Sequence, residues 1–176
     1  MRAQTNRALR EICRLCPAHG ELAVLDNADA HAYAVPGRPG RILVSSGLLR
    51  AATPDDRRVV LAHERAHPVH RHHRLRALTE LAAVLNPLLV PARSALAFLV
   101  ERWADEAAAA VVGSRRQAAA ALARIALTTS PSRFAPGILA FHRESVVERV
   151  LALQACPSTS RKSGRGDPGP GLAWPG

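Results

Sequence analysis

The chain has 176 residues, enough for one domain with a hydrophobic core and too few for two domains of ordinary size. Hydrophobic residues make up 48% of the chain but aromatic residues only 3%, so the core must consist mainly of alanine, leucine and valine, which favours helices. The net charge of +10 comes from arginines scattered along the whole chain, and this scatter argues against nucleic acid as a partner.

The first predicted element is a helix at residues 4–16, which we assign to an N-terminal segment at 1–19. Two of the three cysteines, Cys13 and Cys16, lie near its end and resemble half of a zinc ribbon whose second half is missing. We interpret them as ordinary helix-end residues. With Cys156 left over from any pairing and no signal peptide, the sequence favours a reducing compartment.

Three short runs with strand-like composition follow, at residues 21–26, 31–35 and 41–46. The segment PGRPG at 36–40 separates the last two runs as a hairpin loop would. The sequence therefore predicts a small β-sheet.

A long helix is predicted to begin at Pro54. Thr53 is a good N-cap, proline suits the first helical position, and Asp55 and Asp56 lie where the helix dipole favours acidic side chains. Further helices are predicted at 95–112 with a stop at Gly113, at 114–128 and at 141–155. Residues 157–176 are rich in proline, glycine and serine and are predicted to be a disordered tail, so that the folded domain covers 20–156.

Residues 77–100 form the most apolar segment of the chain. The segment is interrupted by Glu80, Asn86, Pro87, Pro91 and Arg93. We therefore interpret it as helices that are buried or touch a membrane, and not as a membrane span.

The long helix contains HERAH at residues 63–67. Residues four apart on a helix differ by about 40° in direction and about 6 Å in height, so His63 and His67 can bind one metal ion. Glu64 lies on the adjoining flank, where it can take a proton from a water bound to that ion. Zinc lowers the pKa of such a water, and Glu64 would act as the general base that makes the water a nucleophile toward an amide carbonyl.

A catalytic zinc site needs a third protein ligand and an open fourth position. Glu101 is our candidate, and Asp105 on the same helix face could orient a ligand imidazole through its N–H group. The alternative interpretation is an acidic, solvated helix face that compensates nearby arginines, and the spacing alone favours neither.

The other histidines have less specific settings. His70 lies too far along the helix to share the ion and is predicted to be on the surface or to support a ligand. His72 and His73 lie among arginines and are predicted to form a solvated basic end. His31 and His142 are isolated, and either could help to stabilise an oxyanion.

Several segments together resemble the gluzincin zinc metallopeptidases, the group that contains the HtpX heat-shock protease, the CAAX prenyl protease and the sensor domains of β-lactam-responsive receptors. These segments are AYAVPG…RILVSSGLL (32–49), HERAH (63–67), NPLL (86–89) and ERWADEAA (101–108), in the family's order. The resemblance covers about residues 21–155. It implies an α+β, mostly α-helical, zincin-like metallopeptidase domain with a small β-sheet packed against the HExxH helix.

The resemblance also implies the roles of the site residues. Zinc would be held by His63, His67 and Glu101, with Glu64 as general base and Asp105 as support for a ligand. The expected activity is that of a zinc metalloendopeptidase, which hydrolyses peptide bonds with a metal-activated water.

The implied partner is a peptide or protein substrate. The strand that contains Ile42, Val44 and Ser46 could offer its edge to an extended peptide. Family members usually carry several membrane-spanning helices, whereas this chain shows no clear span and no signal peptide. The resemblance therefore implies membrane association, and the sequence otherwise favours the cytoplasm.

Pro68 departs from the family pattern. It removes a backbone N–H donor and its ring presses on the carbonyl of Glu64, so the helix is expected to kink or end at the metal site. This departure leaves a second hypothesis, a zinc-binding but catalytically inactive sensor or regulatory domain.

Overall fold

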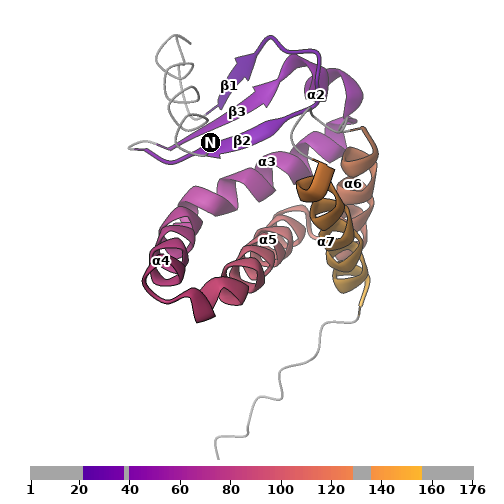
Figure 1. Ribbon diagram of the computed structural model, residues 1–176. Coiled ribbons are helices and arrows are strands. Elements are labelled where there is room, and N and C mark those ends of the chain that lie inside the picture. Colours follow the sequence, from indigo (N-terminus) through magenta and orange to yellow (C-terminus); the bar gives the residue numbers. More distant parts are fainter. Residues whose placement is uncertain (1–21, 38–39, 129–135, 156–176) are drawn as a thin grey trace, which may run out of the picture.

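The computed structural model describes residues 22–37, 40–128 and 136–155, except for the side chains of 136–144. In chain order the elements are β1 (Leu22–Leu25), β2 (Ala32–Val35), β3 (Arg41–Ser45), α2 (Ser46–Ala51), α3 (Pro54–Val69), α4 (His72–Leu85), the short 3-10 helix η1 (Pro87–Leu89), α5 (Val90–Val112), α6 (Arg115–Thr128) and α7 (Pro136–Gln154). One small sheet and a majority of helical residues confirm the predicted α+β class (Figure 1). The predicted N-terminal helix, its two cysteines and the predicted tail lie outside the described residues.

The three strands form one sheet with the order β1-β3-β2. β1 runs parallel to β3 and β2 runs antiparallel to it, which confirms the predicted hairpin. Leu43 and Val44 in β3 are buried almost completely, as expected for a central strand covered on both faces. The sheet lies along one side of α3, and α5 packs against the opposite side (Figure 1).

The central position of β3 makes one prediction wrong. Ile42, Val44 and Ser46 cannot offer a strand edge to a substrate, because β3 is paired along one side with β1 and along the other with β2. Ile42 and Val44 are also buried, and Ser46 begins α2 with its hydroxyl donating to Asp26. In the described sheet, the strand edge next to α3 belongs to β2.

Helix α3 begins as its sequence predicts. The Thr53 hydroxyl accepts a hydrogen bond from the Asp56 N–H, and the Asp56 carboxylate accepts one from the Thr53 N–H, so that the two residues form a capping box around Pro54. Arg124 of α6 adds two-pronged hydrogen bonds to Asp56 at 2.5–3.2 Å. The buried Asp56 therefore joins the start of α3 to α6.

Helix α3 ends just after Pro68. The helix continues through Pro68 to Val69, so the proline lies in its last turn and the backbone from His63 to His67 stays helical. Arg71 then adopts a left-handed conformation with φ of 54°, and α4 starts at His72 in a new direction. Pro68 thus marks the end of the helix beyond the histidine pair instead of breaking the helix within it.

Alanine-rich surfaces hold the helices together. Val59 of α3 packs with residues of α5, α6 and α7 in one buried cluster that also contains Ala108, Ala109, Ala118, Ala119, Ala121 and Leu153. Small side chains let the helix backbones approach closely, and this is how a chain poor in aromatic residues builds its core. Helix α5 ends at the predicted stop, Gly113, which adopts a left-handed conformation with φ of 74°.

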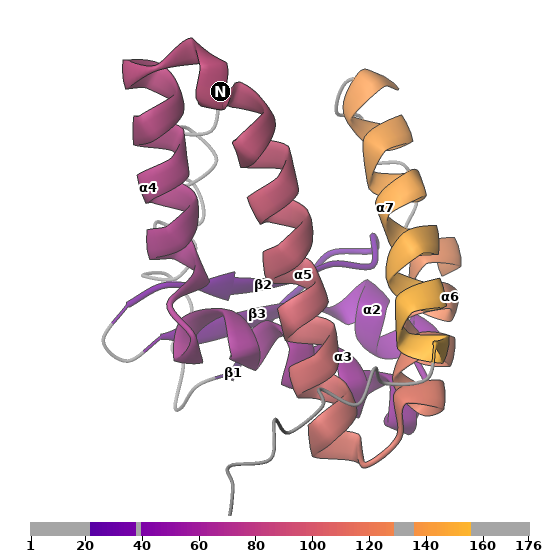
Figure 2. The same ribbon diagram turned by 90° about the horizontal axis from the view of Figure 1, so that it is seen from below.

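Helix α4 and the first half of α5 leave this core. Figure 2 shows them running side by side away from the sheet, and η1 joins them at their far end. Within the described part of the chain, no helix combines the length and the apolar character needed to cross a membrane.

Candidate metal centre

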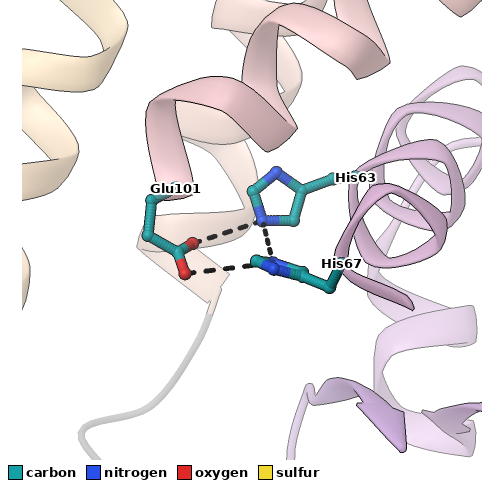
Figure 3. Close-up of side chains that lie close together, drawn as sticks. All are labelled: His63, His67 and Glu101. Atoms are coloured by element: carbon teal, nitrogen blue, oxygen red, sulfur yellow. Dashed lines mark hydrogen bonds and ion pairs between the residues drawn. The ribbon is translucent and has the colours of Figure 1, made fainter. Parts of the chain in front are cut away.

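Three side chains from two helices converge on one point. His63 and His67 project from consecutive turns of α3, and Glu101 reaches them from α5 (Figure 3). The Nε2 atoms of the two histidines are 3.3 Å apart, and Glu101 lies 3.3 Å from His63 Nε2 and 3.9 Å from His67 Nε2. The structure therefore brings together the three residues that were predicted as metal ligands.

These separations fit a zinc ion. Tetrahedral zinc binds nitrogen and oxygen at about 2.0–2.2 Å, which places neighbouring ligand atoms about 3.3 Å apart. Two imidazole nitrogens and one carboxylate oxygen are a common donor set for zinc that leaves the fourth position open. Among the described residues, these three form a group whose ligand atoms all lie within 4.8 Å of one another.

Asp105 fixes the orientation of His63. Its Oδ1 atom lies 3.0 Å from His63 Nδ1, so the carboxylate accepts the Nδ1–H and directs Nε2 toward the other ligands. Burial alone would lower the pKa of His63, but its hydrogen bonds with Asp105 and Glu101 outweigh burial and raise the pKa to about 9. Without a metal ion, His63 therefore carries a proton shared with these carboxylates.

Arg149 of α7 supports both acidic residues. Its guanidinium donates to the two Asp105 carboxylate oxygens at 2.6 Å each, and it lies 3.4 Å from Glu101. Burial would raise the pKa of Glu101, but His63, Arg149 and His67 together hold it far below its ordinary value. Arg76 of α4 also donates to Glu101 at 2.6 Å. The sequence did not point to Arg149, since one arginine among many in a predicted helix carries no distinguishing signal.

The prediction for the position of His72 is wrong. It was expected at a solvated basic end, yet only 1% of it is exposed, and its Nδ1 lies 2.9 Å from Nδ1 of His67. Burial lowers the pKa of His67 to about 4, and the neighbouring His63 and His72 add to this effect. Burial also lowers the pKa of His72, so both imidazoles are neutral near pH 7. The left-handed turn at Arg71 directs His72 inward, and the flanking arginines in the sequence gave no sign of this turn.

Glu64 lies beside the three ligands, between α3 and the sheet. Its carboxylate accepts a hydrogen bond from the backbone N–H of Ala34 in β2. Burial raises the pKa of Glu64 to about 7, with a contribution from the charge of Glu101. A carboxylate that takes up and releases a proton near neutral pH suits general base catalysis.

The remaining described histidines do not contact the three ligands directly, although the ring of His70 stacks on that of His72 with centroids 5.7 Å apart. His70 is exposed, as predicted, and its ring centroid is 4.7 Å from that of Trp103. His73 is exposed, also as predicted. His31 packs against Tyr33 and lies 3.8 Å from Asp29. The side chain of His142 is outside the described residues, so an oxyanion role for His31 or His142 stays a prediction.

A small sheet beside a helix that bears HExxH, with a glutamate supplied by a later helix, defines a metallopeptidase with a zincin-like fold. The sequence model of Peptidase family M48 matches residues 3–130, most of the chain. The chain belongs to this family, which confirms the gluzincin resemblance. No curated protein and no solved structure matches the chain.

Proposed function

We propose that the protein is a zinc-dependent endopeptidase in which His63, His67 and Glu101 hold the metal ion and Glu64 is the general base. The observation that carries this proposal is the convergence of the three ligand atoms at separations of 3.3 to 3.9 Å. A solvated acidic face, the alternative considered for Glu101, does not account for a carboxylate that lies against both imidazoles.

The chemistry expected of the chain follows from these positions. Zinc, when bound, would polarise a carbonyl oxygen and lower the pKa of a coordinated water. Glu64 would take one proton from the attacking water while the water oxygen forms a bond to the peptide carbonyl carbon. It would then pass a proton to the departing amine nitrogen as the peptide C–N bond breaks. Asp105 would keep His63 in the tautomer that binds metal.

The substrate is expected to lie along β2. This strand forms the edge of the described sheet next to α3, and the Ala34 N–H that reaches Glu64 belongs to this strand. An extended peptide that pairs with a strand edge gains main-chain hydrogen bonds without requiring a particular sequence. Pairing with β2 would place a peptide carbonyl beside Glu64, so β2 replaces β3 as our proposed substrate strand.

The inactive alternative was motivated by Pro68. The helix, however, runs past Pro68, and the two histidines keep their spacing one turn apart. This geometry supports the active enzyme over the inactive domain, and we therefore prefer the active enzyme.

The test compares the parent with Glu64→Gln. Metal analysis of the purified full chain should find about one zinc per chain in both proteins, because Glu64 is not a ligand. Cleavage of an unfolded fluorescent protein substrate should fall about 10²- to 10⁴-fold in the variant. Glu148→Gln, an exposed change on α7, is the matched control and should cleave like the parent. Equal cleavage by Glu64→Gln and the parent, at equal zinc content, would show that this mechanism is wrong.

A further inference from the structure

Arg76 of α4 is a half-exposed cation in contact with the metal centre, and the roles proposed above leave it unused. Its Nη2 atom donates to Oε1 of Glu101 at 2.6 Å, and 47% of the Arg76 side chain is exposed. Arg149, by contrast, is only 9% exposed and is held by Asp105 through two hydrogen bonds. Replacing Arg76 therefore shows what one guanidinium does for Glu101 without leaving a buried charge unpaired.

The two carboxylate oxygens of Glu101 have different surroundings. Oε2 lies 3.3 Å from His63 Nε2, the separation expected of two ligand atoms on one tetrahedral ion, and its contact with Arg149 is long at 3.4 Å (Figure 3). Oε1 lies further from His67 Nε2, at 3.9 Å, and accepts the short charge-assisted hydrogen bond from Arg76. Oε2 is therefore the oxygen available to a metal ion, and Oε1 is the oxygen that Arg76 holds.

Arg76 reaches Glu101 because of the turn that starts α4. The left-handed conformation of Arg71 sets the direction of the helix, and His72 and Arg76 lie on the same face of it, one turn apart. From this face His72 contacts His67, a proposed ligand on α3, and Arg76 contacts Glu101, the proposed ligand on α5. One face of α4 thus supports a ligand from each of the two helices that form the site.

We propose that Arg76 is a positioning residue of the metal centre, which holds Oε1 of Glu101 so that Oε2 alone faces the ion. This inference rests on the proposed zinc site. A glutamate side chain loses rotational freedom when it binds a metal ion, and a partner that orders the carboxylate beforehand reduces this loss. The planar guanidinium of arginine fixes the direction of a carboxylate better than the ammonium group of lysine does.

The charge of Arg76 has an effect of the opposite sign. A guanidinium near a divalent cation repels it, so removing the charge would by itself strengthen zinc binding. The side chain is half exposed, however, and water and salt screen the repulsion. We therefore expect the loss of positioning to outweigh the relief of repulsion, and the sign of the measured change separates the two effects.

Zinc affinity of the full chain, measured by competition with a chromophoric chelator, tests this proposal. Arg76→Met should weaken zinc binding by about 10- to 100-fold, and Arg76→Lys should recover part of the loss. The matched control is Arg74→Met, which removes an exposed arginine about 200° around the same helix and should bind zinc like the parent. In the zinc-free state all three variants should unfold at the same urea concentration as the parent, because these side chains are at least half exposed.

Two further measurements show whether Arg76 acts through Glu101. In a Glu101→Ala background, Arg76→Met should not weaken zinc binding any further. Cobalt(II) binds the same kinds of ligand as zinc, and its visible absorption weakens as the coordination number rises. In cobalt-loaded Arg76→Met, Oε1 is free to bind beside Oε2, so the absorption should be weaker than in the parent and in Arg74→Met.

Several results would overturn the role of Arg76. They are zinc affinity of Arg76→Met equal to or higher than that of the parent, an equal loss with and without Glu101, and a cobalt spectrum that Arg76→Met leaves unchanged. A parent that binds no zinc would overturn this inference together with the proposed site. Failure of the catalytic mechanism alone has a different signature, because Glu64→Gln would then cleave like the parent while Arg76→Met still weakened zinc binding.

Discussion

The Nδ1 atoms of His67 and His72 are 2.9 Å apart in a buried setting, so one imidazole must donate its proton to the other. His72 Nε2 is buried without a hydrogen-bond partner among the described residues, and it cannot bind the same ion as His67 Nε2. The arrangement compatible with metal binding is a neutral His72 that accepts the Nδ1–H of His67. His67 then keeps its Nε2 lone pair for the ion, as Asp105 ensures for His63.

We expect His72→Ala to weaken zinc binding by about 10- to 100-fold, because His67 would lose the group that fixes its tautomer and ring orientation. His72→Asn should recover part of the loss, since an amide oxygen can accept the same hydrogen bond. The exposed neighbour provides the control, His73→Ala, with unchanged affinity. Competition with a chromophoric chelator measures all three. Equal affinity of His72→Ala and the parent would show that His72 only fills space.

Removing Glu101 should affect zinc more strongly than removing His72. We expect Glu101→Ala to lower zinc affinity by about 100-fold or more, because two imidazoles alone make an incomplete site. Glu106→Ala, one turn and a residue further along α5, removes an acidic side chain that pairs with Arg102 and Arg115 instead. Full zinc content in Glu101→Ala would assign the third ligand to another residue.

The sequence predicts the parts of this site that lie within one helix better than the contacts between segments that are far apart in the chain. Helical geometry alone places His63 beside His67, and the capping residues around Pro54 locate the start of that helix. The assignment of Glu101 as a ligand depended on the family pattern. Its position beside the histidines comes from the packing of α5 against α3, which the spacing in the sequence does not reveal. Arg149 was missed since its partners come from α5, far away in the sequence.

The substrate strand was assigned wrongly for a related reason. Strand composition predicts which residues are extended, but not which strand lies in the middle of a sheet. The crossover that brings β1 beside β3 leaves β2 at the edge next to α3. The burial of His72 was missed for a similar reason. The direction of its side chain depends on the left-handed conformation of Arg71, which the sequence did not indicate.

The buried pair of Arg149 and Asp105 should matter for stability even without metal. Arg149→Met should lower the free energy of unfolding by about 3–5 kcal/mol, since Asp105 would be left as a buried charge without its main partner. Combining it with Asp105→Asn should restore part of this loss. Arg102→Met breaks a more exposed pair with Glu106 and should cost less than about 1 kcal/mol. Urea unfolding of the zinc-free protein provides the values, and equal costs for Arg149→Met and Arg102→Met would contradict this account.

Asp56 should make stability depend on acidity. Hydrogen bonds from Arg124 lower the pKa of Asp56 and outweigh the opposing effect of burial, with Thr53 contributing. A carboxyl group whose folded pKa is depressed stabilises the fold above its unfolded pKa of about 4, and this stabilisation is lost as the pH falls through the folded pKa. Asp56→Asn should therefore cost about 1–2 kcal/mol at pH 7, and the difference from the parent should shrink below about pH 4.

Urea unfolding of the parent and Asp56→Asn at several pH values measures this difference. Asp55→Asn changes the exposed neighbour and serves as control for a general charge effect. A difference between parent and Asp56→Asn that stays constant from pH 7 to strongly acidic solution would contradict the assignment.

The contact of Arg149 with Asp105 and Glu101 also has a consequence for biosynthesis. All three proposed ligands and the base lie before residue 102, whereas the guanidinium that balances their acidic partners arrives with α7, beyond the segment matched by the family. When a nascent chain has emerged from the ribosome as far as α6, it contains all the proposed zinc-binding groups but not yet the guanidinium of Arg149. Completion of the metal centre therefore depends on α7, which is translated after all of these groups.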